Sequence, residues 1–343
     1  GVDWGVMTPH GTDALMAALA GALDLDGLRD PGEVIVPAYT FIATASAPLA
    51  VRCQIALADV DPETYTLDPT AVESMIGPDT VAVVAVHLGG QPADMETLGE
   101  VASRHGLALI EDCAQAHGAA WRGRRVGSWG DCGAFSFQSS KNLTSGEGGC
   151  VTTADFDLFE RVVSFVDVGR RPHGERWEYP RLGWNYRPSE YLAALLAARL
   201  PSLEDDLLRR SANAAYLSGL LSPFDGLDAP CLAAGASSHA YHLYMMTYRP
   251  EAFGGHSREE FVRALNAEGI PSSAGYTQPL SDQPALSELR QTYPGMIRVG
   301  ELPATRAACA QSVWLPQALL LAETWEMDDI ATAISRIQRA WTR

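Results

Sequence analysis

Short apolar runs alternate with segments of helical period through the first two hundred residues of the chain. The run at residues 81–86 is uninterrupted, as is typical of a strand that is covered on both faces. Strands are predicted at residues 33–37, 55–58, 81–86, 108–110, 133–137 and 150–153, and helices at 41–50 and 94–105, the latter with Asp94 as its N-cap. This alternation predicts an α/β fold with a mostly parallel sheet between helices.

The pattern changes after Pro188. Two long helices, separated near Pro201, are predicted at residues 189–200 and 203–221, followed by a strand at 241–248 and helices at 258–267 and 328–341. The sequence therefore predicts two domains, a large one over residues 1–200 and a smaller C-terminal α/β domain over residues 201–343.

The chain has 25 basic residues, and only Lys141 is a lysine. A coding bias explains arginine wherever only charge matters. A guanidinium stays protonated and cannot form an imine, whereas a lysine amine can lose its proton and attack a carbonyl. Lys141 also lies in a polar turn between a predicted strand and the glycine-rich stretch 146–149, where the backbone can approach a ligand closely. The pattern predicts a reactive amine in a ligand site.

Two further segments could complete such a site. Asp112 comes just after the strand at 108–110, and ligands of open α/β sheets bind at the carboxyl ends of strands. Gly11 and Thr12 begin an Ala- and Leu-rich helix, whose free N–H groups and positive dipole end suit a phosphate. Taken alone, Asp112 could equally be a capping or ion-paired residue, and many helices begin in a similar way.

Composition argues against several other classes of function. A net charge of −17 leaves no cationic face for nucleic acid, and no apolar run approaches the roughly 18 residues that span a bilayer. The six cysteines are scattered without a Cys-x-x-Cys pair, which argues against disulfides or a metal site and favours the cytoplasm. Because the chain starts at Gly1, almost within a motif, we expect a natural N-terminal segment to be missing.

Six motifs along the chain are similar, in order and spacing, to those of one known family. They occupy residues 11–15, 37–44, 86–87, 112–118, 136–149 and 183–187. Over essentially its whole length the chain resembles the DegT/StrS-type sugar and aminocyclitol aminotransferases, a branch of the fold-type I pyridoxal-phosphate (PLP) enzymes. The resemblance implies that fold, a PLP cofactor that passes through pyridoxamine phosphate, and a homodimer. A dehydrating branch of the family has histidine in place of the lysine, and Lys141 argues against it.

The resemblance also implies roles for individual residues. Lys141 would bind the cofactor covalently and shuttle the proton in transamination, and Asp112 would pair with the pyridine nitrogen. The remaining cofactor contacts would be Phe41 stacked on the ring, Gln115 near its phenolic oxygen, and Gly11, Thr12 and Ser136 at its phosphate. Asn185 would reach the phosphate of the neighbouring subunit's cofactor, so each site would be shared between two chains.

Four residues are predicted to contact the substrate, each with a structural alternative. His87 and His117 could instead be hydrogen-bonded interior histidines, and Tyr276 a core tyrosine. Arg187 could instead form an ion pair at the dimer face. Trp177 and Tyr179, in the loop at 170–181, are expected to border the pocket.

The stretch from Ser136 to Lys141, with Gln138 two residues after Ser136, resembles that of family members that act on cyclitol ketones with glutamine as donor. The sequence thus predicts amino transfer from an amino acid, in the first place L-glutamine, to a keto-cyclitol in secondary metabolism. One alternative is a nucleotide-diphosphate keto-hexose acceptor, whose diphosphate the arginines at 170–171 and 122–125 could bind. An alternative of another class is a PLP-binding regulator without turnover, against which the intact Lys141 and Asp112 argue.

Overall fold

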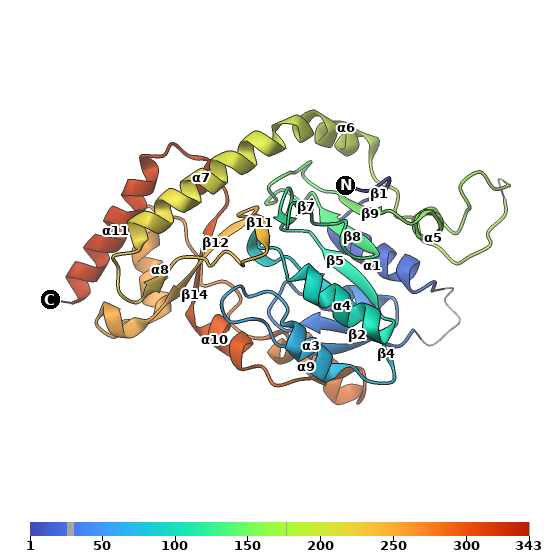
Figure 1. The fold of residues 1–343 in the computed structure, drawn as a ribbon, viewed down its shortest axis with the longest axis horizontal. Helices are drawn as coiled ribbons and strands as arrows, with labels where there is room; N and C mark the ends of the chain where they lie inside the picture. Colours follow the sequence, from blue (N-terminus) through green and yellow to red (C-terminus); the bar gives the residue numbers. More distant parts are fainter. Residues whose placement is uncertain (26–30, 176, 343) are drawn as a thin grey trace.

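The computed structural model describes residues 1–25, 31–175 and 177–342, and a mixed sheet of eight strands forms its centre (Figure 1). Its order is β1 (Trp4–Thr8), β9 (Gly149–Thr153), β8 (Cys132–Ser136), β5 (Ala108–Asp112), β4 (Thr80–Val86), β2 (Glu33–Pro37), β3 (Gln54–Ala58) and β13 (Ile297–Val299). Only β9 pairs antiparallel with both of its neighbours. The predicted mostly parallel α/β sheet is therefore confirmed.

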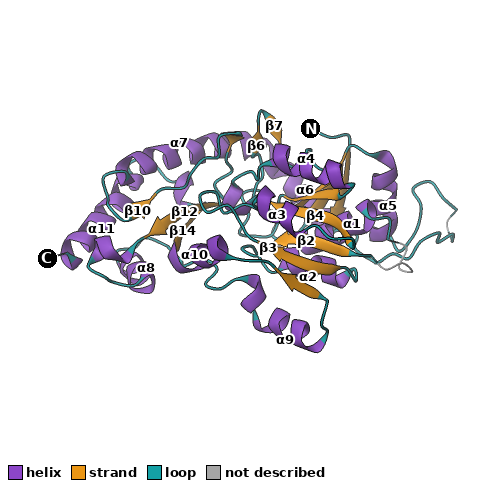
Figure 2. Ribbon diagram, turned by 60° about the horizontal axis from the view of Figure 1, so that its bottom comes forward, coloured by secondary structure: helices purple, strands orange, loops and turns teal. Residues whose placement is uncertain are grey.

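Helices cover both faces of this sheet (Figure 2). One face packs on α1 (Gly11–Ala22), α2 (Ala43–Ala50) and α5 (Phe156–Val166), and the other on α3 (Pro69–Met75) and α4 (Met95–His105). Consecutive side chains of a strand point to opposite faces. In β2, Val34 and Val36 accordingly join the first core and Ile35 joins the second. Burial on both sides explains why these strands read as continuous apolar runs.

The C-terminal part has its own core around a small antiparallel sheet of β10 (Leu227–Asp228), β12 (Leu243–Tyr248) and β14 (Ser312–Pro316). Around it lie α7 (Leu203–Leu221), α8 (Arg258–Ala267) and α11 (Glu326–Trp341), while α6 (Glu190–Arg199) precedes α7 across a short turn at Leu200–Ser202. The remaining elements are β6 (Ala120–Trp121), β7 (Arg124–Arg125) and β11 (Ala236–Ser238), which form a third sheet, with α9 (Pro284–Thr292) and α10 (Pro303–Gln311). No helix in the described ranges is both long and apolar enough to cross a membrane.

The predicted strands and helices appear with shifts of at most two residues at their ends. The strand expected from 241 begins at Leu243, because Tyr241 has a left-handed backbone with φ of 47°. A larger difference concerns β13, which comes from the predicted small domain yet pairs in parallel with β3. We therefore propose a domain division near residue 200 in which the segment around α9 and β13 returns to the large sheet.

Candidate active site

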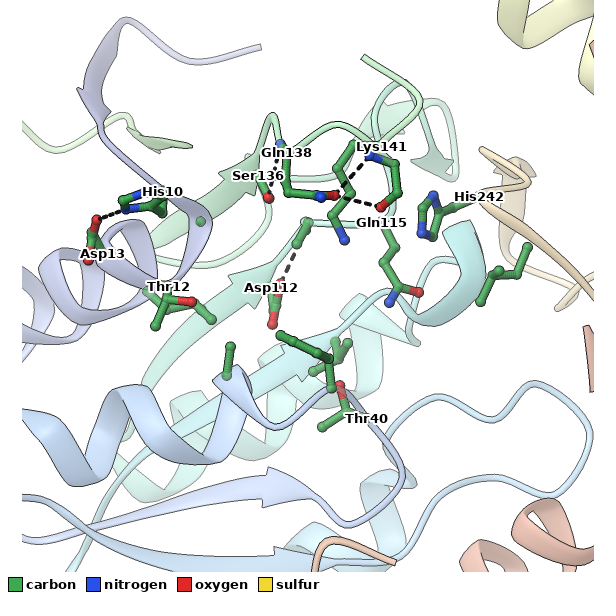
Figure 3. Close-up of a pocket in the computed structure, with 18 of the residues that line it drawn as sticks. His10, Thr12, Asp13, Thr40, Asp112, Gln115, Ser136, Gln138, Lys141 and His242 are labelled. Atoms are coloured by element: carbon green, nitrogen blue, oxygen red, sulfur yellow. Dashed lines mark hydrogen bonds and ion pairs between the residues drawn. The ribbon is translucent and has the colours of Figure 1, made fainter. Parts of the chain in front are cut away.

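A cavity of about 650 Å³ opens at the carboxyl ends of the parallel strands (Figure 3). Loops after β2, β5 and β8, the last residue of β4, the start of α1 and the segment before β12 all contribute to its walls. Most of the predicted site residues line it: Gly11, Thr12, Phe41, Asp112, Gln115, Ser136, Lys141 and Tyr276. The fold thus gathers residues that are up to 265 positions apart (11 to 276) into one cavity.

Asp112 forms the buried acidic end of β5. The hydroxyl of Thr44 donates a hydrogen bond of 2.9 Å to its Oδ2, and the backbone N–H of Ala114 donates one of 3.1 Å to Oδ1. Burial raises the pKa of this carboxyl, whereas these donors and the nearby Lys141 amine lower it. A buried carboxylate held by two donors is suited to pair with one further cationic group inside the cavity.

Lys141 lies in the tight turn that follows β8. Its backbone N–H donates to the carbonyl of Gln138 at 2.9 Å, and the Gln138 Oε1 accepts from the N–H and hydroxyl of Ser140 at 2.8 and 2.7 Å. Gln138 therefore orders the turn that carries the amine. Burial lowers the pKa of Lys141 from its usual 10.5, although the Asp112 carboxylate raises it. Burial thus shifts Lys141 toward the neutral, nucleophilic form of its amine.

The start of α1 forms another wall, next to the end of β8. His10, the N-cap residue, makes no side-chain capping bond, so the first N–H groups of the helix keep their donor capacity. A Cβ built on Gly11 would lie 2.5 Å from the Cβ of Ser136, so only glycine lets the helix approach β8 this closely. Free donors, the helix dipole and the adjacent Thr12 and Ser136 hydroxyls suit a phosphate.

Phe41 and Gln115 bring an aromatic face and an amide to the same cavity. Phe41 is 55% exposed although large and apolar, which leaves its ring free to stack on a planar ligand. Gln115 accepts a 2.7 Å hydrogen bond from the N–H of Gly89 through its Oε1, and its side chain also hydrogen-bonds Tyr276, so its NH₂ group serves this neighbour and keeps one further N–H for a ligand. Together with Lys141, Asp112 and the start of α1, these groups fit an aromatic, phosphorylated aldehyde such as PLP.

Tyr276 stands in the cavity wall beside two other aromatic side chains. Its ring lies edge-on to Tyr39 and Trp314, with centroids 5.5 and 4.8 Å away. Burial raises the pKa of its hydroxyl, which therefore stays protonated and able to donate a hydrogen bond. The structure places Tyr276 where a substrate contact is possible.

Both predicted substrate histidines lie outside this cavity. His87 is fully buried, with Nε2 3.1 Å from Glu111 Oε2 and Nδ1 accepting from the N–H of Ala93 at 3.0 Å. His117 packs against the rings of Phe135 and Phe137, and burial lowers its pKa to about 3. Neither ring lines this cavity in its own chain, and a substrate contact of His87 or His117 stays a prediction.

Asn185 and Arg187 do not line the cavity of their own chain either. The Arg187 guanidinium donates to Asn185 Oδ1 at 2.9 Å and forms an ion pair with Asp167 at 3.2 Å. Trp177 and Tyr179 are exposed in the extended loop after α5 and are also not part of the cavity wall, contrary to expectation.

The arginine clusters proposed for a diphosphate are engaged elsewhere. Arg122 pairs with Glu96 at 2.7 Å and Arg125 with Glu204 at 2.7 Å. Arg170 pairs with Asp167 at 3.3 Å. Within the described ranges, no arginine lines the cavity, and its walls also carry the acidic Asp13 and Glu147.

Some residues of the site were missed from the sequence. Thr44, which orients Asp112, lies in the motif at 37–44, but nothing in that motif distinguishes a hydroxyl aimed at a carboxylate. His242 and Trp314 enter the cavity from the C-terminal part. Sequence gives no signal for such contacts, because they depend on how the two parts pack.

A family model described as the DegT/DnrJ/EryC1/StrS aminotransferase family matches residues 1–335. The chain belongs to this family. It is 38% identical to the L-glutamine:2-deoxy-scyllo-inosose aminotransferase of Streptoalloteichus tenebrarius, over 99% of this chain and 83% of that protein. It is also 38% identical to the L-glutamine:scyllo-inosose aminotransferase of Streptomyces griseus, over 94% and 80%.

Two solved structures have the same fold. The S. venezuelae protein DesV, in complex with a ketimine intermediate, has a TM-score of 0.86 and 35% identity over 98% of this chain and 85% of its own. DesI in the presence of its TDP-sugar product has a TM-score of 0.85 and 30% identity over 100% and 82%. The predicted fold class, family and aminotransferase activity are thus confirmed.

Proposed function

We propose that this aminotransferase binds PLP in the Lys141 cavity and transfers an amino group from L-glutamine to the ketone of a keto-cyclitol in secondary metabolism. One observation carries the proposal: the only lysine amine of the chain and a buried carboxylate, Asp112, meet in one cavity at the carboxyl end of the sheet. When bound, PLP supplies an electron sink for the carbanion that forms at the amino-bearing carbon of the substrate.

The residues of the chain would divide the remaining work. Lys141 would bind the cofactor covalently and, as a neutral amine, take up and return the proton at its Nζ. Asp112 would hold a proton on the pyridine nitrogen by charge pairing. Phe41 would stack on one face of the ring, and Gln115 would donate to its phenolic oxygen through its NH₂ group, which also bonds Tyr276.

Phosphate binding would fall to the start of α1 and the end of β8. The first residues of α1 after His10, including Thr12, line this part of the cavity together with Ser136. They hold an anion with dipoles rather than with a fixed cation, as helix N-termini commonly do.

The choice of donor and acceptor rests on the residues of the cavity walls and on the names of two relatives. The names of both curated relatives specify L-glutamine as donor and an inosose as acceptor. Asp13 and Glu147, with no arginine in the described wall, favour a neutral polyol over an anion. Both features support a cyclitol ketone.

A nucleotide-diphosphate keto-hexose is the second candidate acceptor. The likeness to DesI, solved in the presence of a TDP-sugar product, favours it. A diphosphate needs a cationic partner, however, and Arg122, Arg125 and Arg170 are paired with carboxylates outside the cavity. This acceptor would depend on cations from a second chain.

We also propose a homodimer with shared sites, located in the cytoplasm. The outward face of α6 exposes Tyr191 and Leu195, and the segment that leads to it carries Asn185 and Arg187. A second copy packed here would cover these apolar side chains and receive Asn185 near its cofactor phosphate. All six cysteines are free thiols, which supports a reducing compartment.

Two half-reactions test the proposal. L-glutamine added to the PLP-loaded protein should abolish the visible absorbance of the bound cofactor and leave its pyridoxamine form. A keto-cyclitol such as scyllo-inosose should then restore the absorbance, whereas TDP-linked keto-hexoses should not. If the absorbance responds to no amino donor, the chain is a PLP-binding protein without turnover, and the proposal fails.

A further inference from the structure

His242 enters the cavity from the C-terminal part and makes no contribution to the chemistry described above. It precedes β12 and is largely buried, and its ring points into the cavity beside Gln115 and Lys141 (Figure 3). Its backbone is fixed as well, because the carbonyl of His242 accepts from the N–H of Gln317 at 3.1 Å. A polar ring is thus held rigidly on the wall where a substrate would meet the Lys141 amine.

The neighbour of the catalytic lysine sets the protonation of this ring. Asn142 Nδ2 donates to the carbonyl of Ala240 at 2.6 Å, which turns Asn142 Oδ1 toward His242 Nδ1, 3.1 Å away. An amide oxygen only accepts, so the proton lies on Nδ1. The other nitrogen, Nε2, then carries a lone pair, and no partner for it occurs in the described part of the chain.

The ring stays neutral over the physiological pH range. Burial lowers the pKa of His242 to about 3, and any positive charge on Lys141, together with His117 and Arg210, acts in the same direction. Arg210 is itself buried and bonded through Nη2 to Gln317 Oε1 at 2.6 Å, so this charge is a fixed part of the surroundings. His242 therefore presents a permanent hydrogen-bond acceptor to the cavity.

We propose that His242 Nε2 accepts a hydrogen bond from a ring hydroxyl of the ketone acceptor and so determines which cyclic ketones are used. A polyhydroxylated ring brings donors on every carbon beside the ketone, and a buried acceptor without a donor is costly. A site built to bond a hydroxyl rejects the analogue that lacks it much more strongly than a merely apolar wall does. The inference rests on the proposed function, and it specifies which atom of the protein recognises the acceptor.

A cycle of variants and substrates tests this assignment. His242→Asn keeps a donor toward Asn142 but removes the acceptor at the Nε2 position, whereas His242→Gln keeps an acceptor there. kcat/KM for scyllo-inosose, 2-deoxy-scyllo-inosose and ketones that lack one other hydroxyl each is measured for all three proteins. One missing hydroxyl should cost the wild type about tenfold and His242→Asn almost nothing, because the bond is already lost. His242→Gln should discriminate like the wild type.

Two further measurements make the outcome unambiguous. Nitrogen NMR of the ring should show a neutral Nδ1–H form whose Nε2 signal shifts when a hydroxylated acceptor binds, and Asn142→Leu should mix the two tautomers. His105→Asn, on the outer surface of α4, is the control and should leave the acceptor ratios unaltered. The proposal is overturned if the losses in kcat/KM caused by His242→Asn and by each missing hydroxyl add fully for every ketone. It is also overturned if the Nε2 signal does not shift when the acceptor binds. Absence of any reaction of the wild type with L-glutamine would instead defeat the proposed function itself.

Discussion

Asp112 and Lys141 influence each other across the cavity. Burial raises the pKa of Asp112 and lowers that of Lys141, so in both cases it favours the neutral form of the side chain. In the case of Lys141 the neutral form is the reactive one, so burial activates it. The carboxylate opposes this change, since it stabilises a neighbouring ammonium. A cation on the cofactor ring would take over the carboxylate, which leaves the amine free to act as a base.

This mutual effect gives a prediction for the cofactor-free protein. Acylation of Lys141, followed by mass spectrometry as a function of pH, should show a midpoint below the usual 10.5 of lysine. Asp112→Asn should move that midpoint to still lower pH, because the carboxylate raises the pKa of the amine. The α-amino group of the protein is the internal reference. A midpoint that rises in the variant would contradict this electrostatic account.

Gly11 is a second residue whose identity the geometry demands. Gly11→Ala would place a methyl group 2.5 Å from the Cβ of Ser136 and 2.9 Å from its Oγ. We expect a loss of about 1–3 kcal/mol in the free energy of unfolding and weaker PLP binding. Gly99→Ala in α4, where a Cβ meets nothing within 4 Å, should instead stabilise by about 0.5–1 kcal/mol. Equal melting temperatures for the two variants would refute the close approach.

At the scale of elements, the end of β5 is fixed by a carboxylate that the mechanism does not use. Glu111 is fully buried, and its two oxygens accept from the N–H groups of Gly127, Trp129 and Gly130 at 2.8, 2.6 and 2.9 Å. His87 completes the set at 3.1 Å. The loop after β7 is thereby bound to β5, one residue before Asp112.

Replacement of this carboxylate should loosen the strand end. Glu111→Gln turns an acceptor into a donor that faces backbone N–H groups, and we expect a loss of about 1–3 kcal/mol in urea unfolding. Glu73→Gln, which removes only exposed ion pairs with Arg104 and His105, should change stability by less than about 1 kcal/mol. Similar unfolding midpoints for both variants would show that the network around β5 contributes little.

Some strands of the sheet could be predicted from the sequence and others could not. Apolar runs such as β4 identify strands buried on two faces, because that environment leaves no room for polar alternation. The three residues of β13 give no such signal, and their place beside β3 depends on long-range pairing. Motifs located Lys141 and Asp112, whereas Thr44 required the actual orientation of a hydroxyl. For His87, the sequence could not distinguish a cavity residue from a buried ring bonded to Glu111.

On the scale of the whole molecule, the exposed apolar face of α6 bears on assembly. Tyr191 is 85% exposed and Leu195 is 55% exposed, which is unusual for such side chains on one short helix. Leu195→Glu should yield monomers in sedimentation and reduce PLP affinity, because Asn185 of a second chain would be withdrawn. Tyr293→Glu is the control, as Tyr293 follows α9 on the opposite side (Figure 1). A fully active monomer would contradict the shared site.

The most direct test of the central claim is borohydride reduction of the PLP-loaded protein followed by peptide mapping. The account predicts a stable cofactor adduct on Lys141, the only lysine of the chain, and none in Lys141→Arg, which keeps the charge. If Lys141 is recovered unmodified while the cofactor dialyses away, the amine does not hold the cofactor and the account is wrong.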